Sequence, residues 1–174
     1  RTRSKPERVT NVVETGNEIS AIELDLVRIV FRDPSLLVEI ERVGGLRFLC
    51  HRALAGALAE LAGLTRTDDE VTVADLRDAV QAMPEGVVRH TLLRIMVETE
   101  RTKSSDNVAI LEEVLDRLEV AGLKRKLDEL ISETKREKDE QTLRRMAAKS
   151  LEIRRRIEAL NQRDRQPGAP PPGA

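Results

Sequence analysis

The sequence is nearly without aromatic side chains: its 174 residues include two Phe, no Tyr and no Trp. Proteins that bind single-stranded nucleic acid stack the bases on aromatic side chains, and two Phe can hardly supply such a platform. The net charge is −1, from 30 basic and 31 acidic residues, so the basic excess that neutralises phosphates is also missing. Both absences disfavour nucleic acid as a direct partner.

Cysteine and histidine are also scarce. Cys50 is the only cysteine, which excludes an internal disulfide and a cysteine-based zinc site and favours a reducing, cytoplasmic location. The two histidines, His51 and His90, have no partner at the spacing of metal ligands. Neighbouring residues of a helix point about 100° apart, so Cys50 and His51 do not form a nucleophile–base pair. We expect Cys50 to be packed and His51 to lie at the surface.

Motifs of catalysis and membrane insertion are missing as well. The chain has no Gly-rich phosphate loop, no signal peptide and no apolar run near the ~18 residues of a membrane span. The acidic run 68–70 is typical of a solvated loop rather than a metal site. The basic run 154–156 has Glu152 and Glu158 beside it, as on an ordinary charged helix face. We therefore expect no catalytic residue, no metal, no cofactor and no membrane contact.

Aliphatic and charged residues make up most of the chain. Apolar residues are 40% and charged residues 35% of the sequence, a composition typical of an all-α protein with an aliphatic core. Residues 1–16 are polar and without periodicity, and we expect a flexible linker. Residues 165–174 are rich in Pro, Gly and Ala, and we expect a disordered tail. The chain begins at Arg1 without Met, which suggests a piece of a larger protein.

Helix signals begin with Ser20 and Glu23, which have the spacing of a capping box. The pair Asp33-Pro34 is predicted to end this first helix and to start the next, with Asp33 as N-cap and Pro34 at the first helical position. After Gly44 and Gly45, a single helix is expected over 46–62, ending at Gly63.

Further signals follow at regular intervals. Thr72 and Asp75 predict a capped helix through Met83, and Pro84 is expected to open another. Ser104 or Ser105 can cap the next helix. The connections between these predicted helices are short, which favours packing of consecutive helices against each other. Residues 17–121 are therefore predicted to form a helical bundle.

Beyond Gly122 the apolar stripe changes phase. Leu111, Leu115 and Leu118 mark one seam, and Leu123, Leu127 and Leu130 mark another. An uninterrupted helix from 105 to 164 would span ~90 Å and leave its stripe in water. A reversal near 136–140, with Asp139 as N-cap, lets the chain pair with itself without the association entropy of a dimer. We predict a bundle followed by a protruding antiparallel helical hairpin over 122–164, joined by a long shared helix.

The second helix of the predicted hairpin also exposes apolar surface. Its seam consists of Met146, Ser150, Ile153 and Ile157, and Leu151 lies about a third of a turn outside it. The candidate partner-binding residues are Leu151, Arg155, Ala147, Arg144 and, beside the seam on the preceding helix, Ile131. Arg next to an apolar side chain is favoured at protein interfaces, although scattered apolar residues are also common on protein surfaces.

The order of these features resembles the C-terminal helicase-binding domain of bacterial DnaG-type primases. "ELDLVRIVFRDPSLLVEI" (23–40) is similar to its first two helices and "LRFLCHRALAGALAEL" (46–61) to its third; "LEEVLDRLEVAGLKRKLDELI" (111–131) and "SLEIRRRIEAL" (150–160) are similar to its long connecting helix and its closing helix. The resemblance implies a non-catalytic domain that docks on the N-terminal collar of the hexameric replicative helicase and recruits primer synthesis to the fork. The tail from 165 departs from the family, which usually stops near the closing helix.

Two other interpretations remain open. The N-terminal domain of the replicative helicase has a similar bundle and hairpin, although a Pro-rich lead-in would be expected there. A dimeric coiled-coil adapter through residues 111–160 is the other alternative, although the phase change at Gly122 disagrees with one heptad register. The primase interpretation predicts a monomer, and the adapter a dimer.

Overall fold

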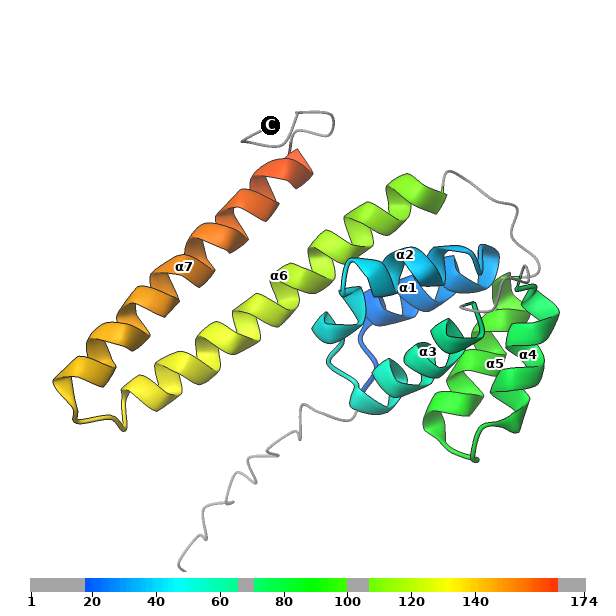
Figure 1. Cartoon of the computed structure of the whole chain (residues 1–174), viewed down its shortest axis with the longest axis horizontal. Helices are drawn as coiled ribbons and strands as arrows, with labels where there is room; N and C mark the ends of the chain where they lie inside the picture. Colours follow the sequence, from blue (N-terminus) through cyan, green and yellow to red (C-terminus); the bar gives the residue numbers. More distant parts are fainter. Residues whose placement is uncertain (1–17, 66–70, 100–106, 166–174) are drawn as a thin grey trace, which may run out of the picture.

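The computed structural model describes residues 18–65, 71–99 and 107–165 (Figure 1). Within these ranges the chain forms seven α-helices, one 3-10 helix and no strand, which confirms the predicted all-α class. The elements are α1 (Ala21–Arg32), α2 (Leu36–Arg42), η1 (Gly45–Phe48), α3 (Arg52–Leu64), α4 (Val73–Ala82), α5 (Val87–Thr99), α6 (Asn107–Thr134) and α7 (Glu140–Arg165). No helix in these ranges is long and apolar enough to cross a membrane.

Several predictions fall on other residues. The linker at 1–16, the acidic run 68–70 and the caps Ser104 and Ser105 lie outside the described ranges. The predicted tail does so too, except for Arg165, which is the last residue of α7.

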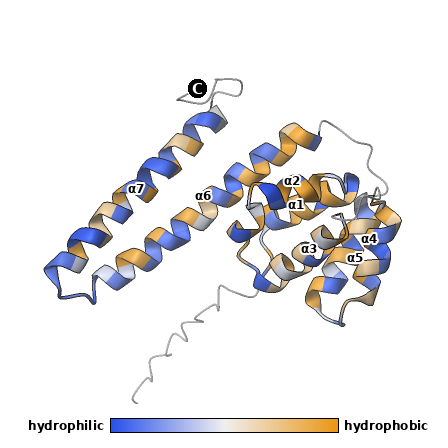
Figure 2. Cartoon of the chain, in the orientation of Figure 1, coloured by the Kyte–Doolittle hydropathy of each residue, from blue (hydrophilic) through white to orange (hydrophobic). Residues whose placement is uncertain are grey.

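Helix α1 is the centre of the bundle. It contacts α2, α4, α5 and α6, and Leu26, Val27 and Val30 on it have no exposed surface. Full burial of one such side chain contributes about 1.5–3 kcal/mol, so this helix anchors the core. The hydrophobic colouring of Figure 2 gathers on α1 and α2, whereas long stretches of α7 are hydrophilic.

Two predicted capping boxes are confirmed. At the start of α1, the Ser20 hydroxyl accepts from the Glu23 N–H at 3.3 Å, and the Glu23 carboxylate accepts from the Ser20 N–H at 2.8 Å. Thr72 and Asp75 make the same reciprocal pair at the start of α4. Each pair satisfies N–H groups that the first helical turn leaves without partners.

The predicted first residues of two helices, α2 and α5, are wrong. Helix α1 ends before Asp33 as expected, but α2 begins at Leu36, with Ser35 at its N-cap. The Leu36 N–H donates to the Asp33 carbonyl oxygen, so residues 33–36 form a turn before the helix begins. Similarly, α5 begins at Val87 rather than Pro84, since the first bond into it runs from the His90 N–H to the Gly86 carbonyl oxygen.

The helix expected over 46–62 is divided in two. The Glu23 carboxylate accepts from the N–H groups of Cys50 at 2.6 Å and His51 at 2.9 Å, which holds the backbone extended between η1 and α3. His51 then caps α3, its Nδ1 accepting from the Leu54 N–H at 3.1 Å. Helix α3 also passes through Gly63 and ends at Leu64.

The expected position of His51 is therefore wrong as well. Its side chain is buried, with 8% exposed, because a capping ring must lie over the first turn of its own helix. Cys50 is half-buried, and burial raises the pKa of its thiol. A raised pKa keeps the thiol protonated, which does not favour a nucleophile.

Helix α6 belongs to both parts of the molecule. Its first half buries Leu111, Val114 and Leu118 in the bundle, and it passes through Gly122 without a break to reach Leu130 (Figure 1). The proposed boundary at residue 121 stays a prediction, because it falls inside a single helix. Helix α7 returns beside α6 in the opposite direction.

Candidate partner-binding surface

The chain reverses over residues 135–139, which contain no Gly or Pro. The Glu137 carboxylate accepts from the N–H groups of Lys138 at 2.7 Å and Asp139 at 2.9 Å, which closes the turn. Asp139 then caps α7, as predicted, by accepting from the Thr142 N–H at 2.7 Å. Hydrogen bonds from the side chain and backbone of Thr142 lower the pKa of Asp139, so the cap is charged at neutral pH.

One face of α7 packs against α6. Ile153 and Leu160 are buried on this face, and Met146, Ser150 and Ile157 are half-buried. The Ser150 hydroxyl donates to the Met146 carbonyl oxygen at 2.9 Å, so the polar residue in the seam satisfies itself on its own helix. Leu130 of α6 lies in the same contact with 7% of its surface exposed.

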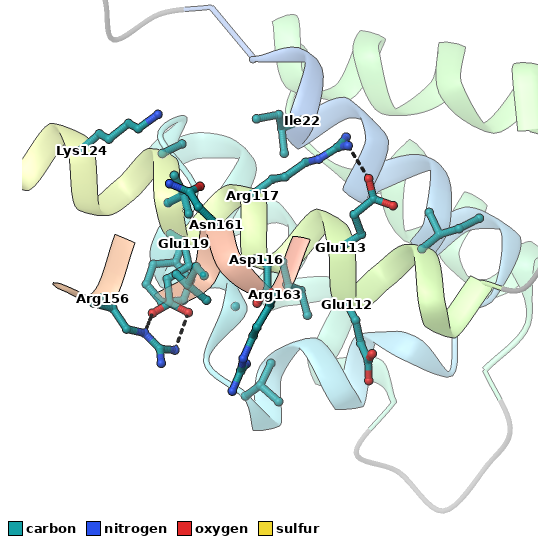
Figure 3. A pocket seen from close by; sticks show the side chains of 18 of the residues that line it. Ile22, Glu112, Glu113, Asp116, Arg117, Glu119, Lys124, Arg156, Asn161 and Arg163 are labelled. Atoms are coloured by element: carbon teal, nitrogen blue, oxygen red, sulfur yellow. Dashed lines mark hydrogen bonds and ion pairs between the residues drawn. The ribbon is translucent and has the colours of Figure 1, made fainter. Parts of the chain in front are cut away.

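An ion pair joins the two helices close to the bundle. Arg156 of α7 donates to both oxygens of Glu119 of α6, at 2.7 and 3.1 Å (Figure 3). The hydrogen bond to Glu119 raises the pKa of Arg156. A bidentate guanidinium–carboxylate pair fixes orientation as well as distance, so this contact adds to the apolar packing that holds α7 against α6.

Around this ion pair lies an open hollow of about 1380 Å³, between α6, the end of α7 and η1. Figure 3 shows acidic and basic side chains of α6 and basic side chains of α7 around it. Burial raises the pKa of Asp116, and the nearby charge of Arg163 partly offsets this effect. Because charges of both signs line it, the hollow has no single electrostatic preference for a ligand.

The opposite face of α7 is open to solvent. Leu151 has 51% of its surface exposed, the highest value for any Leu in the described residues, and Arg144, Ala147 and Arg155 are exposed as well. Ile131 differs: it is half-buried and belongs to α6, so it does not share this face. The structure thus brings four of the five candidate residues onto one helix and leaves the fifth beside the seam.

The predictions did not include Ala148, which is also exposed. Residues 144, 148, 151 and 155 follow the spacing i, i+4, i+7 and i+11, which places them on one line along a helix. We call Arg144, Ala148, Leu151 and Arg155 the outward stripe. Ala147 lies to one side of it. The helical spacing was visible in the sequence and could have identified Ala148.

Within the described ranges, no group of three or more His, Cys, Asp or Glu side chains could hold a metal ion. Comparison of the chain with protein-family models, curated proteins and solved structures found no match. The geometry of the described residues is therefore the basis for a functional proposal.

Proposed function

We propose that this chain is a docking domain that works as the C-terminal helicase-binding domain of a DnaG-type primase. In this role it binds the N-terminal collar of the hexameric replicative helicase and brings primer synthesis to the replication fork. The observation that carries the proposal is the α6–α7 pair, which extends from the bundle (Figure 1). The face of α7 opposite its seam exposes Leu151.

Helix α7 uses only one of its faces to pack against the rest of the fold. Its inner face packs on α6, but its outer face, with Leu151 half exposed, packs on nothing in the described part of the chain. An exposed Leu between Arg residues combines apolar area with charge-assisted hydrogen bonding, which suits a protein interface. A helix tied to the molecule along one side can present the other side to a large partner without a change of fold.

The coiled-coil adapter is less consistent with the same contacts. Leu130, Ile153 and Leu160, which such a dimer would need in its own seam, are already buried within one chain. A second copy would have to displace α7 and break the Arg156–Glu119 ion pair. We therefore expect a monomer.

The test is size exclusion with light scattering, on the chain alone and mixed with the cognate hexameric replicative helicase. A monomer that co-elutes with the hexamer supports the proposal. A stable dimer that ignores the helicase contradicts it and favours the adapter. A ring formed by this chain alone would point instead to a helicase N-terminal domain.

Leu151→Asp tests the surface. We expect it to weaken co-elution about tenfold or more, because it replaces an apolar contact with a charge, and to change the free energy of unfolding by less than about 0.5 kcal/mol. The matched control is Val97→Asp on α5, whose side chain is similarly exposed at 54% but lies on the bundle. A large drop in Tm for Leu151→Asp would mean that Leu151 supports the fold.

A further inference from the structure

The outward stripe has an apolar centre between two cations. At about 100° per residue, Arg144, Ala148, Leu151 and Arg155 fall within a sector of about 60°, facing away from the buried Ile153. Arg155 follows Arg144 by eleven positions, or about 16 Å along the helix axis. The stripe therefore fits a surface that has an apolar recess with a negative charge at each end.

The two Arg side chains of the stripe are not equivalent. Arg144 donates to Glu140 at 2.5 Å, one turn earlier on the same helix, and both side chains are largely exposed. Arg155 has Glu152 and Glu158 three residues away on either side, yet its side chain makes no ion pair within the described residues. Arg155 is ready to bind a carboxylate, whereas Arg144 must first leave Glu140.

The charge of the chain is unevenly distributed. Residues 122–165, which hold the outer half of α6 and all of α7, contain 14 basic and nine acidic side chains. Residues 18–121 contain 12 basic and 20 acidic side chains. The extended end of the molecule is thus positive and the bundle negative, so an acidic partner is attracted to the helix pair and repelled by the bundle.

A protein surface suits this pattern better than nucleic acid. Carboxylates of Glu140, Glu152 and Glu158 interrupt the basic residues along α7, and each would oppose a phosphate backbone. Leu151, at the centre of the stripe, makes no favourable contact with phosphates, but it would fill an apolar recess on a protein surface.

We propose that the outward stripe binds an acidic protein surface in which an apolar recess lies between two carboxylates, and that Glu140 competes with this partner for Arg144. The inference rests on the proposed function in one respect, since that function makes the helicase collar the surface in question. Arg155 provides most of the electrostatic attraction, and the Arg144–Glu140 pair reduces the contribution of Arg144.

The first experiment measures the affinity of the whole chain for the cognate hexameric helicase at 50 and 200 mM salt. We expect Arg155→Ala to weaken binding about tenfold, which is the effect of one charge-assisted hydrogen-bonded contact, and Arg144→Ala about threefold. Arg154→Ala is the matched control: it is exposed and adjacent to Arg155 but points about 100° away. It should leave affinity almost unchanged at both salt concentrations.

Glu140→Gln is the decisive variant. We expect it to tighten binding about twofold at 50 mM salt, because an i,i+4 ion pair no longer holds Arg144. The gain should disappear in the double variant Glu140→Gln/Arg144→Ala. Glu140 also lies in the first turn of α7, where a negative charge stabilises the helix, so Tm should fall slightly while affinity rises. A purely structural effect would lower both.

A second probe keeps the inference separate from the proposed function. It is a synthetic helical peptide with one Leu and a Glu four to five residues away on each side, titrated into the labelled chain. We expect amide shifts at residues 144–155 that are absent in Leu151→Asp, and none with a peptide that has Lys in place of Glu.

The outcomes then divide clearly. If the helicase does not bind but the acidic peptide does, the proposed function fails and the inference stands. If the helicase binds and neither Arg155→Ala nor Glu140→Gln changes affinity, the inference is overturned and the function stands. Tighter binding of duplex DNA than of either probe, lost in Arg155→Ala, would overturn it in favour of nucleic acid.

Discussion

At the residue scale, the side chain of Glu23 joins two distant parts of the backbone. Its carboxylate is fully buried and accepts from the N–H groups of Ser20, Cys50 and His51. Burial raises the pKa of Glu23, but the hydrogen bonds, that of His51 foremost, lower it more, so the net shift is downward. A charged, buried carboxylate therefore ties the start of α1 to the start of α3.

Glu23→Gln tests this tie. One carboxylate oxygen becomes an NH₂ group that faces N–H donors, so we expect a loss of about 2 kcal/mol in the free energy of unfolding at pH 7. The folded-state pKa lies below the ordinary value of 4.5, so the charge stabilises the fold above pH 4.5 and this contribution is lost as the pH falls through the lower value. The difference between wild type and variant, measured by urea unfolding, should shrink below pH 4.5.

Asp75→Asn is the control for that prediction. Asp75 makes the same kind of capping box at an exposed helix start, where water can replace the lost bonds. Its effect should be clearly smaller. An equal loss for both variants would mean that capping alone, rather than burial of Glu23, accounts for the effect.

At the element scale, η1 fixes where α6 leaves the bundle. Phe48 at the end of η1 lies against Gly122, and its carbonyl oxygen accepts from Arg125 at 3.1 Å. Gly45 at the start of η1 lies against α2 and α6, where an added Cβ would come within 2.7 Å of Leu115 and 3.3 Å of the Ile40 carbonyl oxygen. Both glycines thus lie where η1 packs against α6, but an added Cβ has room at Gly122 and not at Gly45.

Gly45→Ala and Gly122→Ala should therefore have opposite effects. Gly45→Ala should destabilise the chain by about 1–2 kcal/mol, because Leu115 and the backbone of α2 must move. At Gly122 the added Cβ would lie 3.4 Å from the Phe48 ring, an ordinary contact, and Ala has a higher helix propensity by about 0.8–1 kcal/mol. Thermal unfolding followed by circular dichroism measures both. A loss of stability in Gly122→Ala would show that this part of α6 needs the freedom of glycine.

At the scale of the whole molecule, the bundle owes little of its buried core to α7. The core cluster is formed by α1 to α6 and their connections, and it does not include Ile153 and Leu160, the buried residues of α7. The bundle thus has a complete core, and the helix pair is a second, smaller packing unit on one of its helices.

Truncation after Thr134 tests this division. We expect the bundle to keep its cooperative unfolding and hydrogen-exchange protection, because its core residues stay in place. The outer half of α6 should lose protection or pair with a second copy, since Leu130 would then face water. Loss of protection throughout α1–α5 would mean instead that the bundle depends on α7.

Much of the fold could be predicted from local pattern. The all-α class, the capping boxes at Ser20 and Thr72 and the cap at Asp139 depend on residues three positions apart. The exposure of Leu151 was also predictable, because a side chain about a third of a turn outside the buried seam of a helix faces away from the partner helix.

Only the tertiary structure decided the rest. The break between η1 and α3 depends on Glu23, which lies 27 residues from Cys50 in the chain, and no local pattern records that contact. The burial of His51 follows from the same break. The Arg156–Glu119 pair, 37 residues apart, likewise exists only once α7 lies against α6. The sequence by itself determined the helices and their apolar faces, because these depend on neighbours within two turns. Contacts between distant residues decided where the helices break and how they are joined.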